Sequence, residues 1–417
     1  MDMPDNKLSW LALLESRHPT EIELGLDRIK QVADRMHLQP ESAKIITVSG
    51  TNGKGSTCAI LESIYRSAGY KTGRYASPHL IDFNERIQLD GCDVDDQLLI
   101  TAFTEIERVR GDISLTYFEF STLAAFWCFK HYEAVIWIVE VGLGGRLDAT
   151  NILDADVAIV TSIALDHQDW LGSDLTIIGQ EKAGVFRSGA YAVCSETVNN
   201  QGVIKVANDI NCQLFIKDQQ FKFELGTSDW LWQGRDLLQN TISYSQLPIP
   251  NLPVVNAAAA LQAIVLADLS VTKTAINQGL SNATLPGRLQ ELTKQGTDYI
   301  LDVAHNPHAA HYVVQELKRR SIKPDTMIIG MLSDKDVAGT LAELSKLQCS
   351  NIYLVTLDVH RGQKAAQMAE YVSKDLPIRQ FDSVESAIKQ ANLQASTVLI
   401  CGSFVTVGKS LTLLEGY

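Results

Sequence analysis

Ten residues near the N-terminus, 48–57, read VSGTNGKGST and combine three glycines with a lysine and several hydroxyls. We expect a strand before this stretch and a helix after it, which turns backbone N–H groups and a helix dipole toward one anion. Lys54 would neutralise phosphate charge, and Ser56 or Thr57 could offer an oxygen to Mg²⁺. The stretch therefore predicts a nucleotide-phosphate site; the alternative is a glycine-rich turn without a ligand.

The spacing of this loop is not that of the common Walker A motif, G-x-x-x-x-G-K-[ST]. Here Gly55 separates Lys54 from the hydroxyl of Ser56, and the glycines that precede the lysine stand closer together. The loop alone thus indicates phosphate binding without specifying the reaction.

Ionisable side chains also follow two other predicted strands. Glu140 ends the apolar run WIVE, and His167 lies just after the run IAL, between Asp166 and Asp169. Ligands of open α/β sheets bind beyond the carboxyl ends of the strands, so Glu140 and His167 are candidate metal ligands. From the residues alone Glu140 could equally cap the glycine turn that follows it, and imidazole is an uncommon ligand for Mg²⁺. Both assignments stay open at this level.

Two further motifs contain charged residues, and each motif can be interpreted as functional or as purely structural. Lys182 lies in a predicted helix that ends at Gly184, where a surface cluster of Glu, Lys and Arg is the simpler interpretation. Asp302 and His305 follow a strand in the second half of the chain, where they could touch a nucleotide or a substrate. Asp302 could instead serve only to form an Asx turn.

The elements that must position these residues are short apolar runs alternating with helical patterns, which is typical of a parallel sheet covered by helices. Helices are expected over 56–68 and 256–268, and the region from about 200 to 245 is expected to form a meander of antiparallel strands. The expected buried strands are 44–48, 134–139, 157–165, 191–195, 299–303, 326–330, 351–356 and 397–401.

The chain length and a cluster of turn-forming residues predict two domains. A chain of 417 residues exceeds one ordinary core, and Ala283-Thr-Leu-Pro-Gly-Arg288 has the turn residues of a linker. We expect a P-loop-type α/β domain over 1–286, with a mainly parallel sheet and a small antiparallel β region. A second, smaller Rossmann-like α/β domain is expected over 287–417.

Composition excludes several classes of protein. The net charge of −13 argues against a general binder of nucleic acid or anionic membranes. The seven cysteines form no C-x-x-C pair, so a disulfide framework or a zinc site is not expected and a reducing cytoplasm fits. No apolar run reaches the ~18 residues of a membrane span, and the N-terminus does not resemble a leader.

Taken together, the motifs resemble those of one family. GTNGKGS is followed in order by SPHL from Ser77, EVGLGGRLDATN from Glu140, LDHQDWLG, EKAG, PGR and DVAHNP. This series is similar to that of the folylpolyglutamate synthases, and more narrowly of the bacterial bifunctional dihydrofolate synthase/folylpolyglutamate synthases, within the Mur-ligase superfamily. The resemblance extends over essentially the whole chain.

The resemblance implies an ATP-dependent amide ligase that adds L-glutamate to dihydropteroate and to tetrahydrofolate through an acyl phosphate. It implies ATP and Mg²⁺ as cofactors, a monovalent cation as a possible further one, and a CO₂-derived carbamate on Lys182. The implied partners are small molecules, in a cytoplasmic monomer. His305 is a hypothetical base for the glutamate amine, beside Lys54 and Lys182 as catalytic residues.

The resemblance also assigns residues to ligands. The implied metal ligands are Ser77, Glu140, His167 and Ser56. The implied ATP contacts are Thr51, Asn52, Gly53, Lys54, Gly55, Ser56, Asn256, Arg288 and Asp302, the last two from the linker and the second domain. The implied dihydropteroate pocket, which favours dual activity, contains Ser16, Arg17, His18, Pro19, Thr116, Tyr117, Phe118, Glu119, Leu147, Asp148 and Ala149.

Overall fold

The computed structural model describes residues 3–17, 23–372 and 376–416. Within these ranges the chain separates into two compact units, one of residues 1–79 and 83–284, the other of 80–82 and 285–417. Each has its own sheet and hydrophobic core. None of the described helices is long and apolar enough to cross a bilayer.

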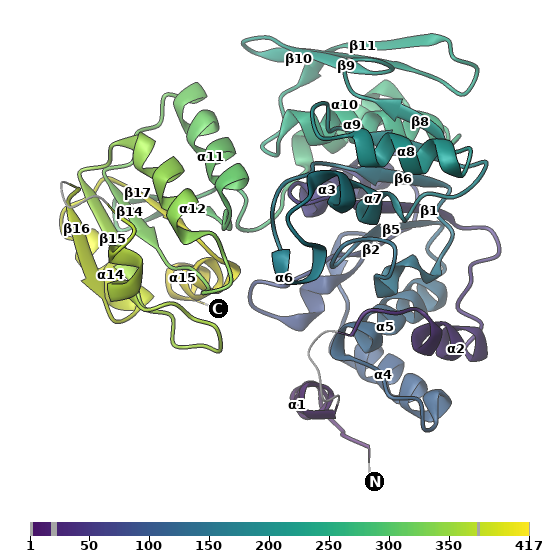
Figure 1. Ribbon diagram of the computed structural model, residues 1–417, viewed down its shortest axis with the longest axis horizontal. Helices are drawn as coiled ribbons and strands as arrows, with labels where there is room; N and C mark the ends of the chain where they lie inside the picture. Colours follow the sequence, from purple (N-terminus) through teal and green to yellow (C-terminus); the bar gives the residue numbers. More distant parts are fainter. Residues whose placement is uncertain (1–2, 18–22, 373–375, 417) are drawn as a thin grey trace. The chain divides into compact units, whose positions relative to one another are not determined.

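The first unit is built on an eight-stranded sheet in the order β4-β3-β2-β5-β1-β6-β7-β8 (Figure 1). The strands from β2 to β8 in this order pair in parallel, and β3 and β4 form an antiparallel edge. Their bounds are β1 Lys44–Ser49, β2 Thr72–Tyr75, β3 Ile87–Leu89, β4 Cys92–Asp93, β5 Ile136–Glu140, β6 Val157–Val160, β7 Tyr191–Cys194 and β8 Gln213–Ile216.

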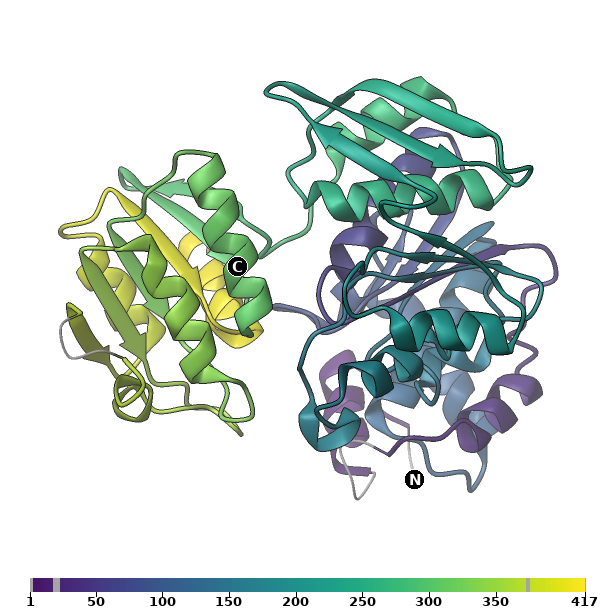
Figure 2. The same ribbon diagram turned by 45° about the horizontal axis from the view of Figure 1, so that its top comes forward.

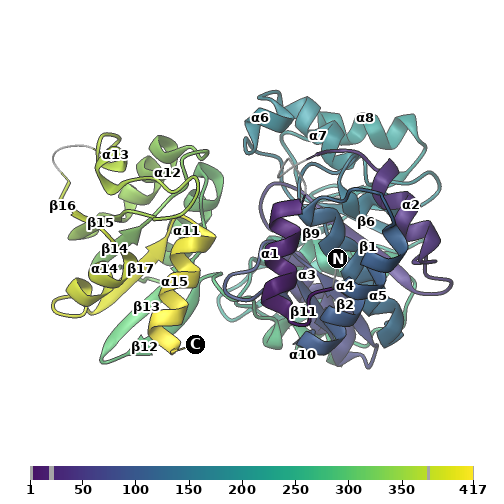
Figure 3. The same ribbon diagram turned by 90° about the horizontal axis from the view of Figure 1, so that it is seen from below.

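Helices cover both faces of this sheet, as the near-continuous apolar strands require. Helices α4 and α5 lie side by side on one face, together with α1 and α2, while α3 and α9 pack on the other (Figures 1 and 3). The bounds are α1 Lys7–Arg17, α2 Asp27–Arg35, α3 Lys54–Ser67, α4 Asp96–Arg110, α5 Tyr117–Tyr132, α6 Gln168–Leu171, α7 Leu175–Ala183, α8 Gln201–Asp209, α9 Val254–Leu266 and α10 Lys273–Asn282, with 3₁₀ turns η1 Phe83–Arg86 and η2 Ala149–Ile152.

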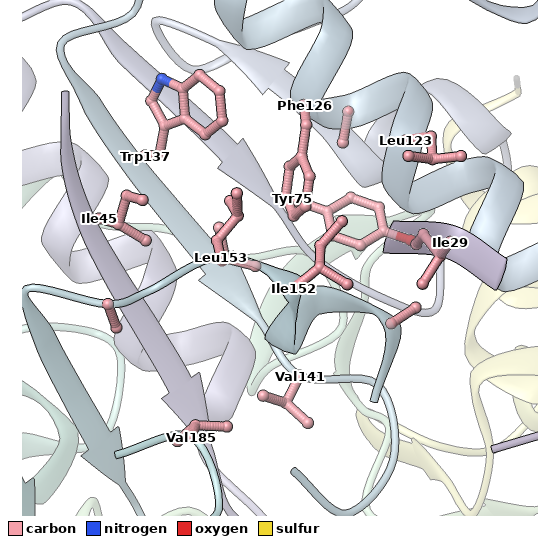
Figure 4. Packing of buried hydrophobic residues seen from close by; sticks show 14 of the residues in the cluster. Ile29, Ile45, Tyr75, Leu123, Phe126, Trp137, Val141, Ile152, Leu153 and Val185 are labelled. Atoms are coloured by element: carbon pink, nitrogen blue, oxygen red, sulfur yellow. The ribbon is translucent and has the colours of Figure 1, made fainter. Parts of the chain in front are cut away.

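The hydrophobic core between α5 and the sheet shows which side chains of β5 face α5 and which face α3. Trp137 of β5 packs against Phe126 of α5, with ring centres 5.9 Å apart, and Tyr75 of β2 lies beside Phe126 (Figure 4). Val141, just after β5, belongs to the same buried cluster. Because side chains alternate along a strand, Glu140 lies on the opposite face, which α3 covers. The parallel register pairs Val48 with Glu140, so the phosphate loop and Glu140 emerge at the same sheet edge.

The region from about 200 to 245 corrects the expectation of a meander throughout. Residues 201–209 form α8, where Val203 and Ala207 at helical spacing are buried, and β8 joins the main sheet in parallel. Only β9 Lys222–Leu225, β10 Asp229–Arg235 and β11 Thr241–Pro248 form the antiparallel sheet, which lies over α9 and α10 (Figure 2). The predicted strand over 157–165 is also shorter, because residues after Val160 turn to the phosphate loop.

The second unit has a six-stranded sheet in the order β12-β13-β17-β14-β15-β16, with cores on both faces. β12 pairs with β13 antiparallel and the others pair in parallel. The bounds are β12 Gln290–Lys294, β13 Thr297–Asp302, α11 Pro307–Arg319, β14 Thr326–Ile329, α12 Val337–Leu344, η3 Ser345–Leu347, β15 Asn351–Val355, α13 Ala365–Ala369, β16 Ile378–Phe381, α14 Val384–Ala391, β17 Thr397–Cys401 and α15 Phe404–Glu415.

Candidate active site

The phosphate loop joins β1 to α3 and is held by the segment that follows β6. Thr51 donates its N–H to the carbonyl of Ser162 at 2.8 Å, and the N–H of Asn52 donates to the Ser162 hydroxyl at 3.0 Å. The hydroxyl of Thr161 in turn donates to the carbonyl of Asn52 at 2.7 Å. These bonds satisfy polar groups that an isolated loop would leave to water, and they fix the shape of the loop.

Gly53 lies against the amide side chain of Asn256 on α9. Its φ is +89°, in the left-handed region, and a Cβ at this position would stand 2.7 Å from the Asn256 Oδ1. Glycine is therefore favoured here by the left-handed backbone, and a larger residue would also have to displace the Asn256 side chain. The structure brings together two predicted ATP-binding residues that lie some two hundred positions apart in the sequence.

Lys54 and the first turn of α3 present the predicted phosphate and metal groups. The Lys54 ammonium curls onto its own loop and donates to the carbonyls of Gly50 at 3.0 Å and Thr51 at 3.1 Å. The hydroxyl of Thr57 is bonded to the Gly53 carbonyl within the helix. Of the two hydroxyls that the motif offers, Ser56 is thus the better candidate for a metal or phosphate.

Ser77 and Glu140 lie together at the carboxyl ends of β2 and β5. The N–H of Ser77 is 3.4 Å from the Glu140 Oε2, and Glu140 is buried. Among the described residues no three or more His, Cys, Asp and Glu side chains gather as a metal cluster. A hydroxyl and one carboxylate nevertheless fit Mg²⁺, which keeps waters and takes phosphate oxygens as further ligands.

His167 lies at the N-terminus of the short helix α6. Its backbone is in the left-handed region, with φ of +51°, and its side chain is exposed. The hard-ligand chemistry of Ser77 and Glu140 does not require an imidazole. The role of His167 as a metal ligand therefore stays a prediction.

Lys182 is buried on α7, which excludes the surface-cluster interpretation of this motif. Burial, together with the nearby charge of Lys54, lowers the pKa of its ammonium from the ordinary value to about 7. Carbamylation requires a neutral amine as nucleophile, and an amine with a pKa near 7 is largely neutral just above neutral pH. The environment thus suits the carbamate chemistry predicted for this residue, and it places Lys182 within electrostatic reach of the phosphate loop.

The glycine-rich turn after β5 is organised by Asp148. Its carboxylate accepts hydrogen bonds from the N–H of Leu143 at 2.8 Å, and from the N–H and hydroxyl of Thr150 at 3.0 and 2.6 Å. Burial raises the pKa of Asp148, and these hydrogen bonds act in the opposite direction. Asp148 therefore shapes the loop as well as being a predicted substrate residue.

The N-terminus of α5 meets this turn through Phe118. A Cβ on Gly142 would lie 2.5 Å from the Phe118 ring, so the two chain segments are in close contact. Thr116 and Glu119 form a capping box that starts α5, with Thr116 N–H to Glu119 Oε2 at 2.8 Å and Glu119 N–H to Thr116 Oγ1 at 3.1 Å. The predicted substrate residues of α5 and of the 142–149 loop thus form one cluster.

Other predicted pocket residues are less closely tied to this cluster. Tyr117 and Leu147 are half-buried, and Ala149 begins the 3₁₀ turn η2. Ser16 is exposed at the end of α1, and Arg17 pairs with Glu107 of α4. His18 and Pro19 lie outside the described residues.

In the second unit, Asp302 ends β13 and organises the turn that contains Arg288. Its carboxylate accepts the N–H of Leu289 at 3.0 Å and that of Ala304 at 2.8 Å, the latter closing an Asx turn as the simpler interpretation expects. Burial raises the pKa of Asp302, while the Arg288 charge opposes the increase. The Arg288 guanidinium stands 5.1 Å from the ring centre of Phe404, a cation–π arrangement.

His305 has a defined tautomer in its neutral form. Its Nδ1 is 2.9 Å from the carbonyl of Val303, so Nδ1 carries the proton and donates it. In the neutral ring Nε2 is then the basic nitrogen. This tautomer suits the predicted role of His305 as a proton acceptor.

Comparison with known proteins identifies the family. The glutamate ligase domain of Mur ligases matches residues 287–404. The dihydrofolate synthase/folylpolyglutamate synthase of Escherichia coli strain K12 is 44% identical over 412 residues, 98% of this chain and 95% of the relative. The chain belongs to the dihydrofolate synthase/folylpolyglutamate synthase family.

Solved structures of this family share the fold over the whole chain. E. coli FolC, in complex with DHPP and ADP, superposes with a TM-score of 0.94 at 42% identity, covering 100% of this chain and 99% of that one. A bifunctional folylpolyglutamate synthase/dihydrofolate synthase with Mn, AMPPNP and L-glutamate bound gives a TM-score of 0.91 at 46% identity, covering 99% and 100%. The expected α/β fold with two sheet-containing parts is confirmed, and so is the ligase class.

The structure also shows residues that contact predicted site residues or the elements that carry them and that the sequence motifs do not reveal. Thr161 and Ser162 were assigned to the interior of a strand, although two hydroxyls directly after a buried apolar run are a signal for a polar turn. Arg74 of β2 and Glu62 of α3 form a buried ion pair, and neither residue belongs to a motif that predicts it. Phe404 contacts both Arg288 and His305, with ring centres of Phe404 and His305 6.0 Å apart.

Proposed function

We propose that the protein catalyses two ATP-dependent ligations of L-glutamate, one to dihydropteroate to give dihydrofolate, the other to tetrahydrofolate to give polyglutamates. The observation that carries the proposal is the grouping of Lys54, Lys182 and the Ser77–Glu140 pair around one phosphate loop. This grouping occurs in a chain that matches bifunctional relatives from end to end.

In the first step the substrate carboxylate attacks the γ-phosphate of ATP, giving an acyl phosphate and ADP. The contribution of the chain is positioning and charge neutralisation: Lys54 leaves the carbonyls of Gly50 and Thr51 to bind phosphate oxygens, and the loop N–H groups point at the same anion. Mg²⁺, which Ser56, Ser77, Glu140 and His167 would hold, neutralises phosphate charge when bound. The carbamate of Lys182 would replace an ammonium that repels Lys54 by an anion that attracts it.

In the second step the amine of glutamate attacks the acyl carbon, and phosphate leaves through a tetrahedral intermediate. The incoming ammonium must first lose a proton, and Nε2 of His305 is the proposed acceptor. The proposed nucleotide contacts of Arg288 and Asp302 belong to the same second unit.

The cluster of Phe118, Asp148 and their neighbours supports the dual activity, because it gives the pterin ring an aromatic side chain and a buried carboxylate. Burial raises the pKa of Asp148, and such a group can hydrogen-bond a heterocycle in either protonation state. The relative in complex with DHPP shows that a family member of the same fold binds such a ligand.

The remaining assignments complete the proposal. Residues 1–286 would form the ATP- and pterin-binding domain, and 287–417 the glutamate ligase domain. The protein would act as a cytoplasmic monomer with ATP, a divalent metal and a monovalent cation, and with small molecules as its partners. Relatives bind ADP, AMPPNP and Mn, in line with ATP and a divalent metal.

Mass spectrometry of the products formed from ATP, Mg²⁺, L-glutamate and dihydropteroate tests the proposal. We expect dihydrofolate, one ADP per amide bond, and polyglutamates when tetrahydrofolate replaces dihydropteroate. Nucleotide binding without any amide product would instead favour an ATP-binding regulator. Product with a cell-wall precursor but with neither pterin would indicate a different Mur-type ligase. The K54A variant serves as the control for contaminating activity.

A further inference from the structure

The N-terminal unit contains a buried ion pair that the proposed mechanism does not use. Arg74 of β2 donates from Nε to the Glu62 Oε2 of α3 at 2.7 Å, and both residues are 4% exposed. Another nitrogen of the same guanidinium donates to the side-chain oxygen of Gln88 on β3. The pair therefore links the helix that begins at the phosphate loop to two strands of the sheet.

The position of Arg74 relates it to the metal candidates. The register pairs Arg74 with Ile138 of β5, so its side chain lies on the α3 face of the sheet, as does Glu140 two residues later. Burial lowers the pKa of Arg74, but Glu62 outweighs this effect and the pKa is raised, with a smaller contribution from Glu140. The guanidinium is thus a permanent cation that interacts with one carboxylate directly and with another through space.

The two elements that this ion pair joins, α3 and β2, each carry or precede a candidate metal ligand. Helix α3 carries Ser56 in its first turn, and β2 ends two residues before Ser77. The distances between these hydroxyls and Glu140 depend on how α3 lies against β2. Arg74 and Glu62 are the ion pair that crosses this helix–strand contact in the described part of the chain.

Stability alone is a weak reason for such a pair. Buried ion pairs often contribute no more to stability than apolar residues of similar volume, because two charges must be desolvated. In the described structure one oxygen of the Glu62 carboxylate, Oε1, is buried without a hydrogen-bond partner, which adds to this cost. An arrangement that is costly for stability, and that links the phosphate-loop helix to the strand of Ser77, indicates a role in geometry.

We propose that Arg74, held by Glu62 and Gln88, is a positioning residue that fixes α3 against β2 so that Ser56, Ser77 and Glu140 present a preformed site to a divalent cation. This inference rests on the proposed function only for the identity of that site, a nucleotide-linked metal site. Arg74 touches neither nucleotide nor substrate in this proposal.

Two variants separate positioning from charge and from stability. R74K keeps the positive charge but cannot bond Glu62 and Gln88 as a planar fork. R74M/E62M removes both charges, so the net charge is unchanged, and fills the space with flexible apolar side chains. R110K is the matched control for Mn²⁺ and ADP binding, because Arg110 also donates two hydrogen bonds from its guanidinium, to Glu107 of α4 at 2.7 and 2.8 Å, away from the metal candidates.

The measurement is Mn²⁺ binding to the protein with ADP, followed by the electron paramagnetic resonance signal of free Mn²⁺, so that no turnover is needed. We expect R74K and R74M/E62M to bind Mn²⁺ roughly tenfold more weakly or worse, the range typical when the support of a metal ligand is removed. ADP binding by the two Arg74 variants without metal, and Mn²⁺ binding by R110K, should stay within about twofold of the wild type, a difference of about 0.4 kcal/mol.

The results of Mn²⁺ binding distinguish a positioning role of Arg74 from a purely structural one. If R74K and the double variant bind Mn²⁺ as the wild type does while their melting temperatures change, the pair is only structural and the proposal is wrong. If R74K does not fold, the double variant decides alone. A wild-type protein that binds Mn²⁺ with ADP but forms no amide product would refute the proposed function and leave this inference standing.

Discussion

The side-chain oxygen of Asn256 stands 2.7 Å from the point at which a Cβ on Gly53 would lie. This proximity joins α9 to the phosphate loop, so a side chain at position 53 would have to displace the Asn256 amide. It also means that one of the predicted nucleotide contacts supports the shape of the loop before a nucleotide arrives.

Replacement of Gly53 by alanine should raise KM for ATP at least about tenfold, because the Cβ must displace Asn256 or shift the loop; a tenfold loss is about 1.4 kcal/mol of binding. The matched control is G69A: Gly69 has φ of +85°, close to the +89° of Gly53, but nothing within 4 Å of its Cβ position. Both variants should lose roughly 1 kcal/mol of stability from the left-handed backbone. Steady-state kinetics and thermal unfolding check this, and equal KM values for the two variants would contradict it.

Removal of the Lys54 ammonium should abolish activity while changing stability little. K54A loses a charge aimed at phosphate, an effect of about 10²–10³ or more in kcat. Its hydrogen bonds in the structure go to the carbonyls of its own loop, so the free energy of unfolding should change by less than about 1 kcal/mol. A large fall in melting temperature would instead show that the lysine holds the fold together.

Lys182 should be needed for activity as a carbamate. K182A should be inactive and partly regain activity with added short carboxylic acids, which can occupy the space of the missing carbamate. Activity is measured against acetate, propionate and butyrate concentration, with K54A as the control that should not respond. Absence of rescue at every concentration would contradict the carbamate.

The lowered pKa of Lys182 also predicts a pH dependence of stability in bicarbonate-free buffer. With a folded pKa of about 7 and an ordinary value of 10.5, the unfolded chain binds more protons between these limits, so stability rises with pH there. The slope contributed is up to about 1.4 kcal/mol per pH unit. Urea unfolding at pH 7 and pH 9 should show this rise in the wild type and a smaller one in K182M; parallel curves would contradict the burial of a neutral amine.

His305 should control the protonation dependence of the second step. H305A should lower kcat by roughly 10²–10⁴, the usual range for a lost general base, and the acidic limb of the kcat profile should flatten. H305Q serves as a comparison, because it can still donate a hydrogen bond to the Val303 carbonyl but cannot accept a proton. An unchanged profile in H305A would exclude the role.

Much of the scaffold was predictable because local pattern and tertiary environment agree. The run before Gly50 is β-branched or apolar from Ile45 to Val48, where the sheet buries it, and the loop residues follow directly, so β1 and the start of α3 were located to within two residues. The segment of α8 was mistaken for a strand because the polar residues around Val203 and Ala207 resemble the alternation of a half-buried strand. Strand β16 was missed because Arg379 and Gln380 are exposed.

The site was predictable only in part for a different reason. Motifs reveal residues that touch ligands, since these need particular types at particular spacings. The supports of Gly53 by Asn256, and of α3 by Arg74, depend on contacts between distant segments, which a single sequence does not display. The burial of Lys182 likewise follows from the packing of α7 and not from the EKAG letters around it.

The bond between the Thr51 hydroxyl and the Ala164 carbonyl, 3.1 Å long, joins positions 113 residues apart. During synthesis the phosphate loop therefore leaves the ribosome long before the segment that is hydrogen-bonded to it. Strand β1 can pair only after its two neighbours, β5 and β6, have been synthesised. Contacts of such long sequence separation form late and slowly. A nascent chain arrested before residue 164 should carry the whole phosphate loop and still fail to hold ATP, because the centre of the sheet that shapes this loop has not yet closed.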